Sequence, residues 1–260
     1  MKNIIVGFFI VCFAVSSIQA KIVTKDKCLL KGDSFIYAGG ECIEYYEALS
    51  DDTDTLNIVV HGIWSEGTNT LGRYSVFADD LSIQTDISTI AVALPGYSGS
   101  STNHLNSLAH KGTKYLASTK EYIDFLSELV LSLKNRYNVK VVNYIGHSAG
   151  AAMGATLIGY NPKLIKNLVS VGGYYDIHKR SRDKSLISAI DYIDNIDKNS
   201  KILLIYGEKD KISKPIVSKE FYKIAKAKNI NVKLVEVKNG VHLDLDMTDT
   251  SVENIVEFLE

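Results

Sequence analysis

Residues 139–150 read Val-Lys-Val-Val-Asn-Tyr-Ile-Gly-His-Ser-Ala-Gly, and this stretch decides the fold. The first seven residues form an apolar, β-branched run that is typical of a buried strand. The last five have the spacing G-x-S-x-G, and the small residues from Ala149 to Tyr160 favour a helix. We therefore predict a strand, a sharp turn and a helix, with the Ser148 hydroxyl standing clear of the backbone. Gly146 and Gly150 permit the close backbone approach that such a turn requires.

The five-residue spacing alone has a simpler alternative, which is a glycine- and serine-rich turn that only caps a helix. The two interpretations differ in what the rest of the chain must supply. A nucleophilic Ser148 needs a base, an acid and donors for an oxyanion, all at the same edge of the sheet. The search for these groups therefore tests the first interpretation.

Composition indicates a single globular domain. The chain has 260 residues, 46% hydrophobic and 23% charged, which is enough for a large buried core. The formal net charge of −1 gives no overall attraction to nucleic acid or to an anionic membrane surface. The sequence has no metal-ligand spacing and no phosphate-binding loop, so it implies neither a metal nor another cofactor.

The first twenty residues have the pattern of a secretory signal peptide. A positive start, Met1-Lys2-Asn3, precedes an apolar run from Ile4 to Val15, and Ala20 ends a candidate cleavage site. The run is short for a membrane-spanning helix, and an uncleaved anchor or a buried first helix are the alternatives. We expect residues 1–20 to be removed and residues 21–260 to form one exported domain, periplasmic or secreted, without stable insertion in the membrane.

Cleavage after Ala20 would remove Cys12 and leave Cys28 and Cys42. Two cysteines in an exported chain indicate a disulfide bond, with two free thiols as the alternative. The bond would close a short loop near the mature N-terminus.

Strand-like and helix-like segments alternate from residue 55 onward, which predicts a mostly parallel sheet flanked by helices. Before it, residues 34–37 and 42–46 predict an antiparallel hairpin across Gly39-Gly40. Short apolar runs predict buried strands at 56–60, 89–94, 139–145, 168–171, 202–206 and 232–237. Apolar stripes at helical spacing predict helices at 122–133, 217–225 and 252–259. Thr250 and Glu253 indicate a capping box at the start of the last helix.

Residues that follow the predicted strands supply the candidate site, because the carboxyl ends of parallel strands meet at one edge. Asp210 follows strand 202–206 as the candidate acid, and Asp176, after the preceding strand, is the alternative. His242 follows strand 232–237 as the candidate base. A carboxylate would hold this histidine in the correct tautomer and stabilise its charged form. The chain order Ser148, Asp210, His242 matches the order given for this arrangement.

Strand 56–60 ends in His61-Gly62-Ile63-Trp64. The His61-Gly62 pair turns the chain, so we expect the Ile63 N–H to join the Ala149 N–H in an oxyanion hole. Ile63 and Trp64 are expected to line the substrate pocket, and His61 is interpreted as a structural turn residue rather than a base. The side chain of His147 should point away from the nucleophile.

Ser98 and Ser100 lie in a glycine- and serine-rich loop and are alternative nucleophiles. They lack the strand, turn and helix that surround Ser148, so a loop role is favoured for both. Of the other histidines, His104, His110 and His178 lie in polar loops without a position at a strand end.

These motifs together resemble the α/β-hydrolase superfamily over residues 34–260. The resemblance rests on His61-Gly62, the loop Leu-Pro-Gly-Tyr-Ser-Gly-Ser at 94–100, the G-x-S-x-G turn, and the later G-x-x-D and G-x-H segments. It implies an α/β-hydrolase fold. Segment 177–201 leaves room for one helix, at 185–193, so we expect a minimal cap or none and an open site.

The resemblance implies a serine hydrolase. Serine at this turn, where haloalkane dehalogenases and epoxide hydrolases would have aspartate, favours acyl-ester chemistry with Ser148, Asp210 and His242 as catalytic residues. We expect a carboxylesterase or lipase-like enzyme that acts on a small ester or acyl substrate. A peptidase, a thioesterase or an acyltransferase would use the same residues. A non-catalytic binding module on this scaffold is the alternative from another class.

Overall fold

The computed structural model describes residues 23–65, 67–99, 105, 108 and 114–260. The predicted signal segment 1–20, Cys12, Ser100, His104 and His110 lie outside the described residues. Among the helices of the described part, none combines the length and apolar character needed to cross a bilayer.

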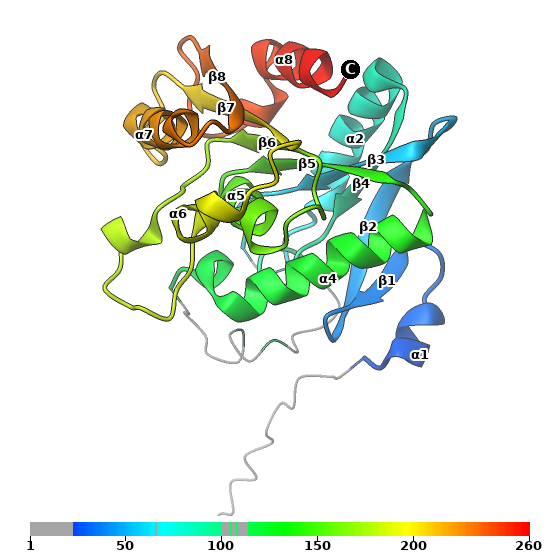
Figure 1. The fold of residues 1–260 in the computed structure, drawn as a ribbon. Coiled ribbons are helices and arrows are strands. Elements are labelled where there is room, and N and C mark those ends of the chain that lie inside the picture. Colours follow the sequence, from blue (N-terminus) through cyan, green and yellow to red (C-terminus); the bar gives the residue numbers. More distant parts are fainter. Residues whose placement is uncertain (1–22, 66, 100–104, 106–107, 109–113) are drawn as a thin grey trace, which may run out of the picture.

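The described residues form an eight-stranded sheet through the middle of the molecule (Figure 1). Its strands are β1 (Phe35–Ala38), β2 (Glu41–Ala48), β3 (Asp52–Val60), β4 (Ile87–Val92), β5 (Val141–His147), β6 (Asn167–Val171), β7 (Lys201–Gly207) and β8 (Asn231–Val237). The order is β1-β2-β4-β3-β5-β6-β7-β8. The β1–β2 and β2–β4 pairs are antiparallel, and all the others are parallel. The predicted N-terminal hairpin and mostly parallel sheet are therefore confirmed.

The strand order reverses between β3 and β5, which are neighbours although β4 lies between them in sequence. The chain leaves β3 toward β2 to form β4, and then crosses back to form β5 on the other side of β3. In sheets of this kind, ligands bind at the carboxyl ends of the strands beside such a reversal. The serine predicted as nucleophile follows β5 directly, so it lies at this point.

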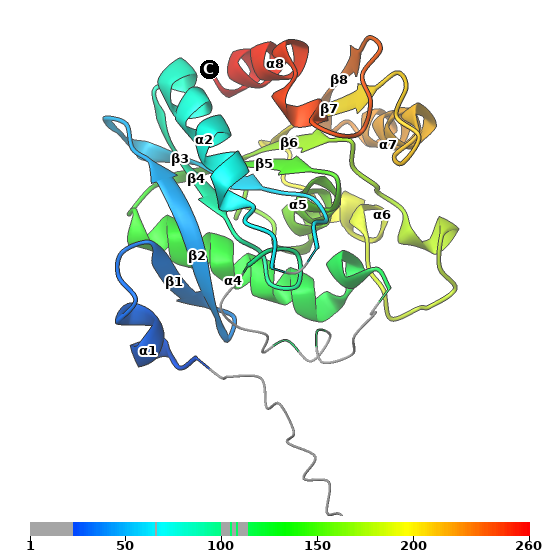
Figure 2. The ribbon, with the colours of Figure 1, turned by 180° about the vertical axis from the view of Figure 1, so that it is seen from behind.

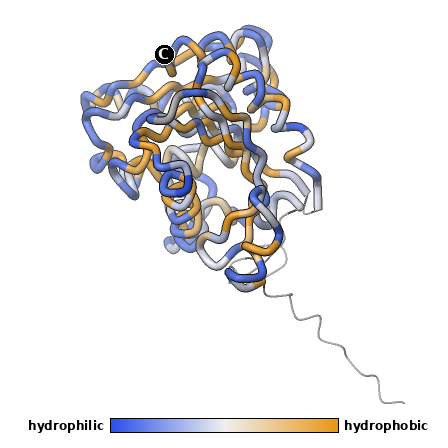
Figure 3. Tube along the Cα trace, turned by 90° about the vertical axis from the view of Figure 1, so that its right-hand side faces the viewer, coloured by the Kyte–Doolittle hydropathy of each residue, from blue (hydrophilic) through white to orange (hydrophobic). Residues whose placement is uncertain are grey.

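Helices cover both faces of the sheet. They are α1 (Lys25–Leu29), α2 (Leu71–Thr85), α4 (Lys120–Arg136), α5 (Ala149–Tyr160), α6 (Ala189–Tyr192), α7 (Pro215–Ala227) and α8 (Asp249–Leu259). One apolar core joins α4, α5, α6 and α7 to the sheet, and a second joins α2 and α8 to its other face. Figures 1 and 2 show α4 and α2 on opposite sides. Figure 3 shows the hydrophobic segments gathered in the interior.

Two helix starts differ from the sequence prediction. The last helix is capped by Thr248, whose Oγ1 accepts a hydrogen bond from the Ser251 N–H at 3.3 Å. The capping box predicted at Thr250 and Glu253 is therefore wrong, because both residues already lie inside the helix. The helix predicted over 185–193 begins only at Ala189 and ends at Tyr192, followed by a 3-10 turn at 193–195.

An amide ladder of three asparagines crosses the parallel part of the sheet. Asn57 on β3, Asn143 on β5 and Asn167 on β6 are in register. Asn143 donates to Asn57 Oδ1 and Asn167 donates to Asn143 Oδ1, each at 2.9 Å. Asn57 in turn donates to Thr89 Oγ1 at 3.2 Å. Because a buried amide is costly when unpaired, the ladder opposes any shift in the register of β3, β5 and β6.

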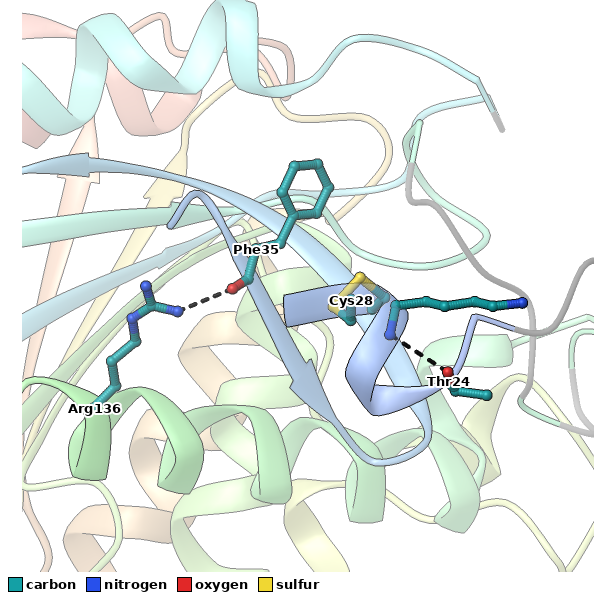
Figure 4. The surroundings of a disulfide bond; sticks show 6 residues. Thr24, Cys28, Phe35 and Arg136 are labelled. Carbon is teal, nitrogen blue, oxygen red and sulfur yellow. Dashed lines mark hydrogen bonds between the residues drawn. A yellow bond between two sulfur atoms is a disulfide. The ribbon is translucent and has the colours of Figure 1, made fainter. Parts of the chain in front are cut away.

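A disulfide bond joins Cys28 of α1 to Cys42 of β2, as the sequence predicts (Figure 4). Both cysteines are fully buried in a small apolar cluster with Val23. Arg136, at the end of α4, donates to the carbonyl oxygen of Phe35 at 2.9 Å on the adjoining strand β1. The disulfide and the arginine together hold the N-terminal hairpin and α1 against the rest of the domain.

His61 follows β3 and joins its end to the end of β4. Its Nε2 accepts a hydrogen bond from the Leu94 N–H at 3.1 Å, so Nδ1 carries the proton and donates to the Gly62 carbonyl oxygen at 2.7 Å. Burial in the protein lowers the pKa of His61 from 6.5 to about 4. His61 is thus neutral near pH 7 and shapes the turn, in agreement with its sequence interpretation.

We expect the disulfide to contribute about 3 kcal/mol to the free energy of unfolding, because it closes a loop whose ends are 14 residues apart. The double variant Cys28→Ser/Cys42→Ser should unfold at lower urea concentration than the wild type, as followed by circular dichroism. Adding a reductant should bring the wild type to the level of the double variant and leave that variant unchanged. A wild-type midpoint that does not respond to the reductant would contradict this expectation.

His61 should make the fold sensitive to acid. Between pH 6.5 and 4 the unfolded chain binds a proton at His61 and the folded protein does not, so stability is lost as the pH falls. The full loss corresponds to about 3 kcal/mol. Urea unfolding at pH 7 and pH 4.5 should show a smaller acid penalty in His61→Gln than in the wild type. The exposed His178→Gln should keep the wild-type penalty, and equal penalties in all three proteins would refute the assignment.

Candidate active site

Ser148 lies in the serine turn (residues 146–150), between β5 and α5. Its backbone has φ 54° and ψ −113°, a left-handed conformation that residues with a side chain seldom adopt. The Ser148 N–H donates to the Val171 carbonyl oxygen of β6 at 2.9 Å, which holds this conformation in place. The predicted strand, sharp turn and helix are confirmed, and the helix has the predicted bounds.

Three glycines make room for the serine turn. A Cβ on Gly146 would lie 2.6 Å from the Gly150 backbone, and one on Gly150 would lie 2.1 Å from the Val60 carbonyl oxygen. Both distances are far below van der Waals contact, so α5 can begin here only if these residues lack side chains. A Cβ on Gly62 would lie 2.9 Å from the Cβ of Ser148. A side chain at residue 62 would therefore press on the serine itself.

The structure brings together the three residues predicted from the strand ends. Ser148 Oγ lies 2.8 Å from His242 Nε2, and Asp210 Oδ2 lies 2.7 Å from His242 Nδ1. The Asp210 side chain is fully buried, and its Oδ1 accepts from the N–H groups of Ile212 and Ser213, each at 2.8 Å. The carboxylate thus holds Nδ1–H, and Nε2 is left as the acceptor for the serine proton.

The alternative acid Asp176 and the neighbouring carboxylate Glu208 make different contacts. Asp176 accepts a hydrogen bond from the His178 N–H at 3.2 Å and lies 3.9 Å from Lys179 Nζ. Glu208 is exposed and accepts from the Asn239 N–H at 2.8 Å. Asp210 is therefore the carboxylate that lies beside His242.

The alternative nucleophile Ser98 is buried, and its hydroxyl donates to the Leu94 carbonyl oxygen at 2.9 Å. It faces its own loop, in line with the loop role favoured from the sequence. Ser100 lies outside the described residues.

His147 has a structural contact that the sequence did not reveal. Its Nε2–H donates to the backbone carbonyl oxygen of His242 at 2.9 Å. The two imidazole rings lie 5.1 Å apart between centroids, and His147 Nδ1 lies 3.8 Å from the buried carboxylate of Asp246. A polar side chain within an otherwise apolar strand end was the available signal. His147 therefore ties the loop that carries His242 to the serine turn.

Ser148 and His242 open on a cavity of about 320 Å³. Its walls come from the loops after β3, β4, β6 and β7 and from the first turns of α5. Among the described residues, no group of three or more histidine, cysteine or carboxylate side chains is placed to hold a metal ion. The cavity thus presents the Ser148 hydroxyl and the His242 imidazole beside mainly apolar and tyrosine walls.

Ile63 and Ala149 both line this cavity, beside Ser148. Within the described part of the chain, neither backbone N–H has a hydrogen-bond acceptor. Two free donors next to a serine hydroxyl are what a developing oxyanion requires.

Trp64 does not meet the sequence expectation, because it is not among the described residues that line the cavity. Its ring lies 5.7 Å from the Arg73 guanidinium carbon instead. Adjacent side chains of an extended segment point to opposite sides, so Ile63 reaches the cavity and Trp64 faces α2.

The sequence matches the profile of a family described as the alpha/beta hydrolase fold over residues 58–181. The matched region contains Ser148 and ends before Asp210 and His242. No curated protein sequence matches the chain.

Several solved structures resemble the fold. The esterase Pf2001 of Pyrococcus furiosus is 20% identical, with a TM-score of 0.67 over 88% of this chain and 91% of the esterase. A CIB-like hydrolase of Thermoplasma acidophilum is 16% identical, with a TM-score of 0.62 over 86% and 95%. Est1E of Butyrivibrio proteoclasticus, solved with ferulic acid bound, is 16% identical, with a TM-score of 0.58 over 86% and 95%.

At these identities the likeness concerns the fold, and it agrees with the strand order and with the strand, turn and helix around Ser148. Together with the family profile over residues 58–181, these findings show that the chain has the α/β-hydrolase fold.

Proposed function

We propose that this protein is an exported serine hydrolase that cleaves carboxylic esters through an acyl-enzyme on Ser148. The observation that carries the proposal is the continuous hydrogen-bond chain from Ser148 Oγ to His242 to Asp210, with distances of 2.8 and 2.7 Å. A serine hydroxyl is a weak nucleophile by itself, and a histidine within hydrogen-bond reach is what activates it.

The first half-reaction would form the acyl-enzyme. Ser148 Oγ attacks the ester carbonyl carbon as its proton passes to His242 Nε2, and the carbonyl electron pair moves onto the oxygen. The N–H groups of Ile63 and Ala149 donate to this oxyanion. The tetrahedral intermediate then collapses, and the His242 imidazolium, stabilised by Asp210, gives its proton to the departing alkoxide.

The second half-reaction would release the acyl group. His242 takes a proton from a water molecule, whose oxygen attacks the acyl carbon and forms a second oxyanion in the same place. Collapse of this intermediate breaks the bond to Ser148 Oγ, and the imidazolium returns a proton to that oxygen. The products are a carboxylic acid, an alcohol and the original enzyme.

The choice of esters draws on the similar structures. Two similar structures, Pf2001 of Pyrococcus furiosus and PE8, are named as esterases. A dipeptidyl aminopeptidase IV of Bacteroides ovatus also resembles this chain, but the match covers only 34% of that protein. Peptidase, thioesterase and acyltransferase activities remain the alternatives that share Ser148. Export is supported by the buried disulfide, since such bonds persist in oxidising compartments.

We expect Ser148→Ala to reduce hydrolysis of p-nitrophenyl butyrate by about 10⁴-fold or more, because no other group would form the acyl-enzyme. A fluorophosphonate probe should label the wild type at Ser148 and leave the variant unlabelled, as read by mass spectrometry. Ser98→Ala is the matched control and should be labelled normally. Normal turnover in Ser148→Ala, or labelling at Ser98, would overturn the proposed nucleophile.

The two acidic candidates give a second prediction. Asp210→Asn should lower kcat by about 10⁴-fold, because a neutral amide no longer selects the histidine tautomer or stabilises its charged form. Asp176→Asn should change kcat less than about twofold, since Asp176 contacts the His178 backbone instead. Both variants should first be shown to fold by circular dichroism. A larger loss in Asp176→Asn than in Asp210→Asn would reverse the assignment.

A further inference from the structure

Most hydroxyl groups in the cavity wall are already used by the protein. The Tyr97 hydroxyl accepts a hydrogen bond from the Ala117 N–H at 3.1 Å, and the Tyr115 hydroxyl donates to the Arg180 carbonyl oxygen at 3.1 Å. The Ser213 hydroxyl donates to the Gly173 carbonyl oxygen at 2.6 Å. Each of these hydroxyls therefore spends part of its hydrogen-bonding capacity within the protein.

Arg180 is different. Among the described residues that line the cavity, it is the one arginine or lysine, and none of them is a carboxylate. Its guanidinium carbon lies 3.5 Å from the centre of the Tyr174 ring, and its Nη2 donates to the Ile212 carbonyl oxygen at 3.2 Å. Although the side chain is exposed, the stacking and the hydrogen bond hold its planar group in one orientation at the cavity wall.

The positive charge of Arg180 is not neutralised locally. Two carboxylates pair instead with the residues that precede Arg180 in sequence: Glu220 lies 2.8 Å from Lys179, and Asp191 lies 2.9 Å from His178. Within the described residues, Arg180 makes no ion pair, and the Ile212 carbonyl occupies only one of its five N–H donors. An oriented guanidinium with free donors is the group that proteins use to bind carboxylates.

We propose that Arg180 binds a carboxylate of the substrate, so that the preferred substrates are esters with an apolar segment between the scissile bond and a free carboxylate. This inference rests on the proposed function, because it concerns the substrate of the Ser148 site. The carboxylate can belong to the acid part or to the alcohol part of the ester. In either case, Ser148 acts at one side of the cavity while Arg180 and Tyr174 hold the anionic end.

The test compares esters that differ only in charge. Mono(4-nitrophenyl) adipate and 4-nitrophenyl hexanoate have acyl chains of equal length, with the carboxylate on the acid part. 4-Acetoxybenzoate has its carboxylate on the alcohol part, and 4-acetoxybenzamide is its neutral partner. We expect the wild type to have a higher kcat/KM for the anionic member of at least one pair, and the pair concerned identifies which side carries the charge.

Variants of Arg180 should remove this preference. Arg180→Met keeps the length of the side chain without its charge, and we expect the anionic-to-neutral ratio of kcat/KM to fall by about tenfold or more through KM. Arg180→Lys should retain part of the ratio, because it keeps the charge without the planar fork. The exposed Arg182→Met is the matched control and should keep the wild-type ratio.

Each outcome separates this inference from the proposed function. A wild type that hydrolyses the neutral esters without preferring either anionic ester, or whose preference survives in Arg180→Met, overturns the role of Arg180 and leaves the serine hydrolase intact. Failure to hydrolyse any of the four esters, together with no fluorophosphonate labelling of Ser148, overturns the proposed function and this inference with it.

Discussion

The site depends on how closely the first turn of α5 approaches the strands beneath it. The backbone of Gly150 is so near the Val60 carbonyl oxygen that a side chain would lie 2.1 Å from it. This contact draws the start of the helix against β3 and forces Ser148 into a left-handed conformation. The same approach leaves the Ala149 N–H facing the cavity rather than a protein acceptor. One steric constraint thus fixes the positions of both the Ser148 hydroxyl and the Ala149 N–H beside it.

The opposite side of the site is held by polar contacts rather than by close packing. His242 lies on a loop after β8, and such loops are more mobile than the elements they connect. Asp210 holds one ring nitrogen of His242, and His147 holds its backbone carbonyl oxygen. His147 belongs to the serine turn, so the loop that carries His242 is joined directly to the turn that carries Ser148. Backbone amides fix Asp210 in turn, which leaves few free rotations in the chain from Asp210 to Ser148.

The sequence predicted the sheet and the central residues of the site well, because each was specified locally. Strand β5 is mostly apolar apart from Asn143 and His147, and Ser148, Asp210 and His242 each follow a mostly apolar strand, so their meeting at one edge was implied by the topology. The misplaced or missed features depend on contacts between distant segments. Trp64 packs beside Arg73 of α2, and the role of His147 depends on a carbonyl oxygen 95 residues away. The cap of α8 was misplaced because Thr248 and Thr250 are equivalent by residue type, and only the backbone distinguishes them.

The amide ladder has a consequence for how this protein can change its substrates over time. Asn57, Asn143 and Asn167 join the three central strands three to four residues before the carboxyl ends of those strands, below the edge that carries Ser148. Alignment of the strands is therefore specified within the sheet, by residues that do not line the cavity. The loops at the carboxyl edge, including the segment that carries Arg180, take no part in aligning the strands. Insertions and substitutions there can reshape the cavity while the sheet keeps its alignment, so specificity can evolve separately from the architecture that supports it.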